Sequence, residues 1–193
     1  ASLFFVTPPL SATTSYAVAV FPGQDWQTVT PEEAGFDPAA FQQAMDLLPS
    51  PVVVIASGRI VGSKGSIAQS DPIFSGGKSV AALVAATLIQ SGFITSNTEV
   101  PGSDHPGPPG ATYGQFMAMT SDFGSAARAP GQHYAYNNEA VVHYGRQMQQ
   151  QFFPGQDVPQ TIFSAFGATL QLQDPVSAFD ESWNGGIAMS SRD

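Results

Sequence analysis

Apolar residues follow a strand-like pattern early in the chain and a helix-like pattern over most of the rest. Residues 51–56 (PVVVIA) form a run rich in β-branched side chains, and residues 59–62 begin a second segment of the same kind. The two are separated by Ser57-Gly58, a turn signal. This pattern predicts an antiparallel hairpin.

Helical periodicity dominates the remainder. A capping hydroxyl, a proline and two acidic residues in the segment Thr30-Pro31-Glu32-Glu33 predict a helix start, because each suits the positive end of a helix. The predicted helices cover residues 36–48, 73–92 after a short approach, 112–119 with Thr112 as cap, 139–152 and 160–166. Residues 101–110 and 129–136 are predicted loops, and residues 187–190 start either a helix or a short strand.

A hairpin interleaved with helices predicts an α+β fold, in which an antiparallel sheet is flanked by helices. With 193 residues the chain is long enough for one domain with its own core. We expect residues 1–25 to be an N-terminal arm and residues 26–193 to form that domain.

The amino-acid composition argues against several classes of partner and of functional site. The formal net charge of −9 and the pI near 4.4 argue against nucleic acid and anionic lipid as partners. No cysteine is present, which excludes disulfides, thiolate metal sites and a cysteine nucleophile. The first twenty residues lack a basic region and contain Pro8 and Pro9, so they do not form a signal peptide, and the apolar helix candidate is too short to span a bilayer. We expect a secreted or periplasmic protein.

Ser75-Gly76-Gly77-Lys78 is a Ser-x-x-Lys motif at the start of an apolar helix. A serine hydroxyl needs a nearby base to become a nucleophile, and a spacing of three places both side chains on one helix face. Burial favours the neutral amine, which can accept a proton. The alternative is a capping serine followed by a surface lysine. However, the chain has only two lysines and places this one among small and apolar residues.

Tyr136-Asn137-Asn138 is a second candidate element. A phenol can pass a proton to a leaving group, and the Asn138 amide can hold a substrate amide. The alternative is a core tyrosine with Asn138 capping the following helix. The three histidines have no metal-ligand spacing, so neither a metal site nor another cofactor is predicted. These histidines are His105, His133 and His143.

Taken in order, six segments between residues 26 and 193 resemble the serine β-lactamase and penicillin-binding-protein family, especially its class C-like esterase branch. Two of them depart from the pattern: Asp122-Phe123 replaces Gly-Leu, and Asn137 replaces Ser. The segments are TPEEAGF, PVVVIASGRIVGSKG, FSGGKSVAALVAATLIQSGFI, TYGQFMAMTSDFG, APGQHYAYNNEAVVHYG and GGIAMSSRD.

The resemblance implies a serine hydrolase that forms an acyl-enzyme on an ester, a β-lactam or an amide or peptide carbonyl. In that mechanism Ser75 attacks, Lys78 takes its proton, Tyr136 relays the proton to the leaving group and Asn138 helps to hold the substrate. The alternative is an inactive or incomplete relative that binds peptide or glycan.

The family's third box, Lys-Thr-Gly or His-x-Gly on a strand, would follow the Gly-Gly segment and is not found up to Asp193. A two-stranded ribbon alone is marginally stable. We therefore expect further strands from residues after Asp193 or from a second polypeptide, one of which supplies an oxyanion donor.

Overall fold

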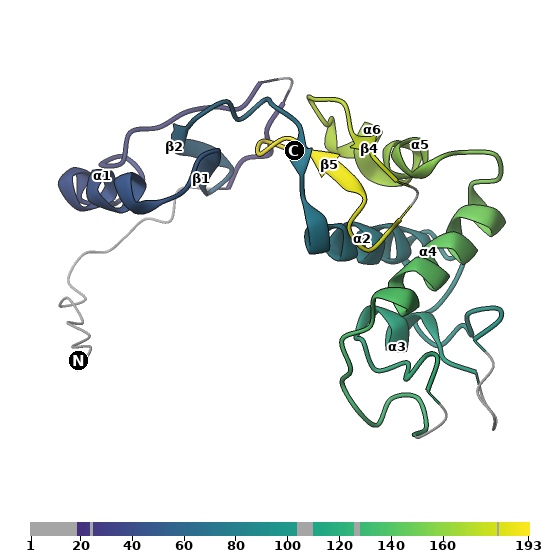
Figure 1. Ribbon diagram of the computed structural model, residues 1–193. Helices are drawn as coiled ribbons and strands as arrows, with labels where there is room; N and C mark the ends of the chain where they lie inside the picture. Colours follow the sequence, from purple (N-terminus) through teal and green to yellow (C-terminus); the bar gives the residue numbers. More distant parts are fainter. Residues whose placement is uncertain (1–18, 24, 104–109, 126–127, 181) are drawn as a thin grey trace, which may run out of the picture. The chain divides into compact units, whose positions relative to one another are not determined.

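The computed structural model describes residues 19–23, 25–103, 110–125, 128–180 and 182–193 (Figure 1). The chain divides into two compact units, Ala1–Gly65 and Ser66–Asp193. Most of the predicted arm lies outside the described residues, and its boundary at residue 25 stays a prediction. No helix in the described ranges is long and apolar enough to cross a membrane.

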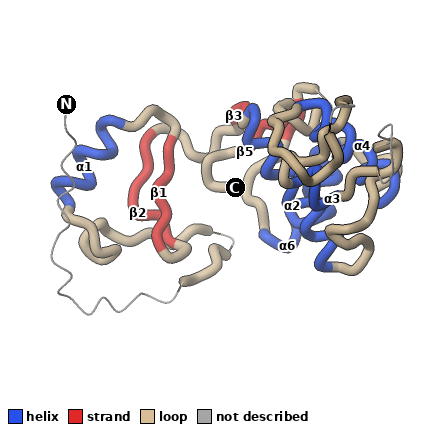
Figure 2. Tube along the Cα trace, turned by 90° about the horizontal axis from the view of Figure 1, so that it is seen from below, coloured by secondary structure: helices blue, strands red, loops and turns tan. Residues whose placement is uncertain are grey.

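The predicted hairpin is confirmed in the first unit. Strand β1 (Val52–Ala56) pairs antiparallel with β2 (Arg59–Lys64), which extends two residues beyond the predicted end (Figure 2). Ser57 and Gly58 between them have φ angles of 50° and 76°. Two left-handed residues in a two-residue loop give the backbone twist that matches the twist of the paired strands, so the turn sequence fixes the hairpin.

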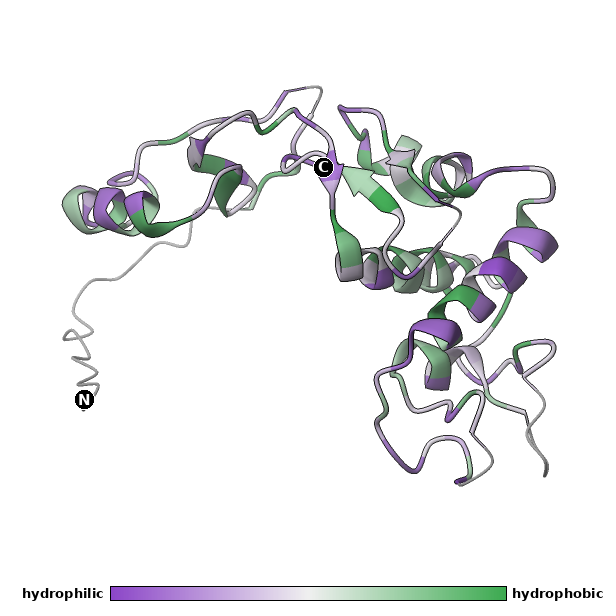
Figure 3. Cartoon of the chain, in the orientation of Figure 1, coloured by the Kyte–Doolittle hydropathy of each residue, from purple (hydrophilic) through white to green (hydrophobic). Residues whose placement is uncertain are grey.

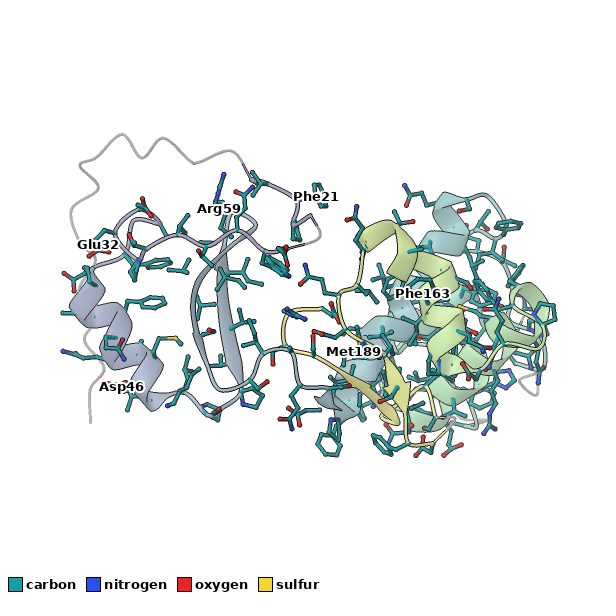
Figure 4. The ribbon with its side chains drawn as sticks, turned by 90° about the horizontal axis from the view of Figure 1, so that it is seen from above. Phe21, Glu32, Asp46, Arg59, Phe163 and Met189 are labelled. Atoms are coloured by element: carbon teal, nitrogen blue, oxygen red, sulfur yellow. The ribbon has the colours of Figure 1, made fainter. Side chains whose placement is uncertain are left out.

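The first helix begins later than predicted. Thr30 and Glu33 do exchange two hydrogen bonds, but the turn that they form is closed by Gly35, whose φ is 86°. Helix α1 (Pro38–Leu47) starts after Asp37, whose carboxylate accepts a first-turn N–H at 2.7 Å. The segment therefore contains two capping signals, and only the second one starts a helix. In Figure 4, Asp46 marks the end of α1 and Arg59 the start of β2.

Three helices that contact one another enclose the core of the second unit. They are α2 (Gly77–Gln90), α3 (Tyr113–Met117) and α4 (Asn138–Phe152). The predicted cap of α3 is confirmed, since Thr112 and Gln115 form a reciprocal capping box. Helix α4 is also confirmed, but its cap is Asn137 and not Asn138.

The last predicted helix is more complex than its sequence pattern. It starts earlier, after Asp157, which forms a second capping box with Gln160. Helix α5 (Val158–Ile162) then widens into a π-helical turn, η2 (Phe163–Gly167), before the short α6 (Ala168–Leu170). Phe163, which is labelled in Figure 4, is the first residue of this turn. Asp157 was a signal in the sequence for this earlier helix start.

A small antiparallel sheet completes the second unit. Its central strand is β5 (Ile187–Met189), flanked by β3 (Asp71–Pro72) and β4 (Ser177–Ala178). The sequence left a helix or a short strand possible at residues 187–190, and the structure has the strand. All three residues of β5 are buried, and the strand appears in hydrophobic colours in Figure 3. The two flanking strands were not predicted, because two residues are too short to show a period.

Gly145 on α4 lies where only glycine fits. A Cβ at this position would overlap the indole ring of the fully buried Trp183. We predict that Gly145→Ala lowers the free energy of unfolding by about 1–3 kcal/mol, the usual effect of overpacking a core. Urea unfolding followed by tryptophan fluorescence measures this effect. Gln150→Ala, at an exposed position of the same helix, is the control. An alanine variant at 145 as stable as the unmodified chain would contradict the packing.

Candidate functional site

Ser75 and Lys78 lie next to each other at the start of α2, as the motif predicted. Ser75 is the middle residue of a 3-10 turn, η1 (Phe74–Gly76), which leads directly into α2. The Lys78 Nζ donates a hydrogen bond to the Ser75 Oγ at 3.0 Å. The lysine is 9% exposed, while the serine is exposed at the surface. A buried amine thus lies beneath an accessible hydroxyl.

The second partner of Lys78 is the backbone carbonyl of Asn184, which accepts from Nζ at 2.7 Å. This carbonyl lies just before Gly185-Gly186, and Gly186 N–H donates to Ser182 O at 2.9 Å. The approach of this segment to α2 is close, because a Cβ on Gly77 would lie 3.2 Å from the Trp183 carbonyl oxygen. Asn184 was not predicted from the sequence, since a backbone carbonyl gives no side-chain signal. Only the neighbouring glycine pair marked the segment.

Tyr136 completes the cluster from the loop before α4. Its hydroxyl lies 2.7 Å from the Ser75 Oγ, and either oxygen can be the donor. The Lys78 Nζ lies 4.9 Å from the centre of the Tyr136 ring, within the range of a cation–π contact. Ser75, Lys78 and Tyr136 therefore meet at one hydroxyl, although 61 residues separate the serine from the tyrosine.

The surroundings of Tyr136 make its phenol more acidic than usual. Its pKa is lowered first by hydrogen bonding with Lys78 and then by the hydrogen bond with Ser75, which outweigh the opposing effect of burial. Two other tyrosines show the reverse, because burial raises the pKa of Tyr113 to about 12 and that of Tyr144 further. Among these three, Tyr136 is the phenol suited to proton transfer.

Asn138, the fourth candidate residue, lies at the start of α4. It is the first residue of α4 and its side chain is exposed. In the part of the chain that the structure describes, no hydrogen bond joins it to Ser75, Lys78 or Tyr136. Its capping alternative is wrong, because Asn137 is the cap. The predicted substrate-holding role stays a prediction.

The histidines lie apart from this cluster. His143 stacks on Phe123 with ring centres 4.5 Å apart, and its Nε2 lies 2.8 Å from the Pro101 carbonyl oxygen. His133 is exposed, and His105 lies outside the described residues. Within the described ranges, no three His, Asp or Glu side chains are grouped as metal ligands.

Phe74, directly before the nucleophile candidate, has an unusual backbone. Its φ is 45°, in the left-handed region that favours glycine, and its side chain is 68% exposed. Such a conformation costs on the order of 1–3 kcal/mol in a non-glycine residue. Strain of this kind gathers at functional sites, which agrees with the position of Ser75.

A cavity of about 600 Å³ elsewhere in the second unit is lined by residues such as Gln156, Phe163, Leu172 and Val176. None of the three clustered residues lines it. We place the candidate site at Ser75 because the groups that can move a proton converge there.

No family model matches the chain, and no curated protein matches it. Solved structures of similar fold include the following two. A Bacillus anthracis protein assigned as a 6-aminohexanoate-dimer hydrolase has a TM-score of 0.65 at 12% identity, covering 91% of this chain and 60% of that chain. FmtA from Staphylococcus aureus has a TM-score of 0.59 at 12% identity, covering 88% and 66%.

These likenesses establish the fold. The chain has a β-lactamase/transpeptidase-like α+β fold, as the sequence resemblance predicted. It spans less than two thirds of the length of either matched chain. At 12% identity the likeness does not carry an activity or a substrate.

The lowered pKa of Tyr136 can be measured. We predict that the absorbance at 295 nm, compared with that of Tyr136→Phe, shows one phenol ionising below the usual pH near 10. Removing the amine in Lys78→Met must raise this pKa, because the phenolate loses the hydrogen-bonding partner that lowers it most. A Tyr136 pKa that does not rise in the Lys78 variant would contradict the geometry.

Proposed function

We propose that the chain carries the acyl-transfer centre of a serine hydrolase, with Ser75 as nucleophile. The observation that supports this most is the Ser75 Oγ within hydrogen-bonding distance of both the Lys78 amine, at 3.0 Å, and the Tyr136 hydroxyl, at 2.7 Å. A serine nucleophile is activated by a base that it contacts, and here a second proton carrier meets the same oxygen.

The proposed reaction has two halves. Ser75 Oγ attacks the substrate carbonyl while its proton passes to Lys78, and the bond to the leaving group then breaks. Tyr136 gives a proton to the leaving group and is reprotonated through Lys78, which its hydroxyl and ring adjoin. Water then attacks the acyl-enzyme and releases the acid, and Ser75 recovers its proton. The reaction consumes one water and needs no redox partner.

The negative charge that develops on the substrate carbonyl oxygen needs hydrogen-bond donors. The backbone N–H of Ser75 is the candidate within this chain, because it belongs to the turn that leads into α2. The second donor, by the resemblance, comes from the strand that carries the third box. The exposed Asn138 is proposed to contact the substrate beside the leaving group.

The substrate is proposed as an ester, a β-lactam or an amide or peptide carbonyl. The Bacillus anthracis neighbour is assigned as a hydrolase of the 6-aminohexanoate dimer, and we therefore include a short amide in the panel of substrates to test.

Covalent labelling tests the nucleophile. We predict that a fluorophosphonate probe labels the chain, and that Ser75→Ala abolishes the labelling without unfolding the protein. Ser79→Ala is the matched control, since Ser79 is an exposed serine one turn further along α2. Equal labelling of the Ser75 variant would place the nucleophile elsewhere. If the folded, unmodified chain is not labelled, the alternative of a non-catalytic binding module is favoured.

A further inference from the structure

The position of Tyr136 depends on the residues beside it in the chain. Its own side chain is 55% exposed, so core packing does not hold the ring. Hydrogen bonds of the residues on both sides hold the backbone that carries the ring. The Ala135 N–H donates to Met119 O at 2.8 Å, and the Asn137 Nδ2 donates to Phe123 O at 2.8 Å. Both bonds cross to the same segment, residues 119–123.

Asn137 has a second bond at the same time. Its Oδ1 accepts from the Ala140 N–H at 3.1 Å, which makes it the N-cap of α4. One amide side chain thus ties the first turn of the helix to a distant carbonyl. A serine can cap the helix, but its single short hydroxyl cannot also reach across to Phe123. An aspartate can cap, but when ionised it has no donor to offer.

The carbonyl that Asn137 binds belongs to a fixed segment. The Phe123 ring packs against Phe116, with centres 5.5 Å apart, and stacks on His143 of α4. The residues on either side, Asp122 and Gly124, have φ angles of 51° and 77°, which define a tight path for the backbone. The bridge therefore joins the start of α4 to a segment that packs against the same helix.

We propose that Asn137 is a positioning residue that fixes the Tyr136 hydroxyl against Ser75 by bridging α4 to the Phe123 carbonyl. This inference rests on the proposed acyl transfer, in which Tyr136 carries a proton. It also gives a physical meaning to one departure from the family pattern, since Asn137 replaces the usual serine and its amide donates to the backbone carbonyl of Phe123.

Two substitutions of Asn137 distinguish its hydrogen bond to the Phe123 carbonyl from its role as the N-cap of α4. Asn137→Ser keeps a capping oxygen and removes the bridge without adding charge, and Asn137→Asp keeps the cap and removes the donor. For both variants we expect kcat for an activated ester, such as p-nitrophenyl acetate, to fall about ten- to hundredfold, as is usual for a misplaced catalytic group. KM changes little, and the Tyr136 titration moves up towards its usual pKa in the neutral serine variant.

A second cap supplies the control. Asp157→Ala removes the N-cap of α5, far along the chain from Tyr136, and lowers the melting temperature without moving the Tyr136 titration. A merely structural Asn137 would behave in the same way. If Asn137→Ser keeps both the kcat and the Tyr136 pKa of the unmodified chain, the positioning role is wrong.

The two proposals fail differently. If the unmodified chain neither hydrolyses the ester nor reacts with the probe at Ser75, the proposed function fails. The tyrosine titration of Asn137→Ser still tests the bridge by itself, and an unchanged titration then overturns it.

Discussion

The buried amine of Lys78 is the constraint on which the site depends. A charged or polar group removed from water must find partners, and here they are the Ser75 Oγ, the Asn184 carbonyl and the face of the Tyr136 ring. These partners come from three separate parts of the second unit. An amine that needs all of them fixes the relative positions of α2, the loop before α4 and the segment before β5.

Two glycines lie where the Asn184 segment packs closely, near Lys78. Gly77 permits close contact with the Trp183–Gly185 backbone, and a Cβ on Gly186 would overlap the Asp180 carboxylate. Trp183 is buried against α4, where it donates to the Gln149 side chain at 3.3 Å. The segment is thus held by packing and hydrogen bonding on both sides of the carbonyl. The position of the Asn184 carbonyl therefore depends on residues that take no part in the proposed chemistry.

The sequence predicted those features that carry a local signal. The Ser57-Gly58 turn and the apolar helix after Ser75 have characteristic composition, and both elements are confirmed. The catalytic candidates Ser75, Lys78 and Tyr136 were found because their chemistry resides in their side chains, and the structure brings them together. Their catalytic roles remain proposals.

The missed features depend on distant parts of the chain. Asn184 acts through its backbone, and Asn137 acts through a carbonyl 14 residues away, so neither has a recognisable spacing. Strands β3 and β4 exist only because β5 lies between them. The first helix was placed too early because two capping signals compete, and the left-handed Gly35 closes the first of them into an isolated turn through local hydrogen bonds.

The central claim is that the Lys78 amine activates Ser75, and the rate of Ser75 acylation in Lys78→Met tests it most directly. The methionine has a similar volume and no proton to exchange, although it leaves the Asn184 carbonyl without its donor. With the variant shown to be folded by circular dichroism, peptide mass spectrometry can follow acylation by an activated ester over time. We expect acylation of Ser75 about 10²- to 10⁴-fold slower than in the unmodified chain. Acylation at an unchanged rate would contradict it.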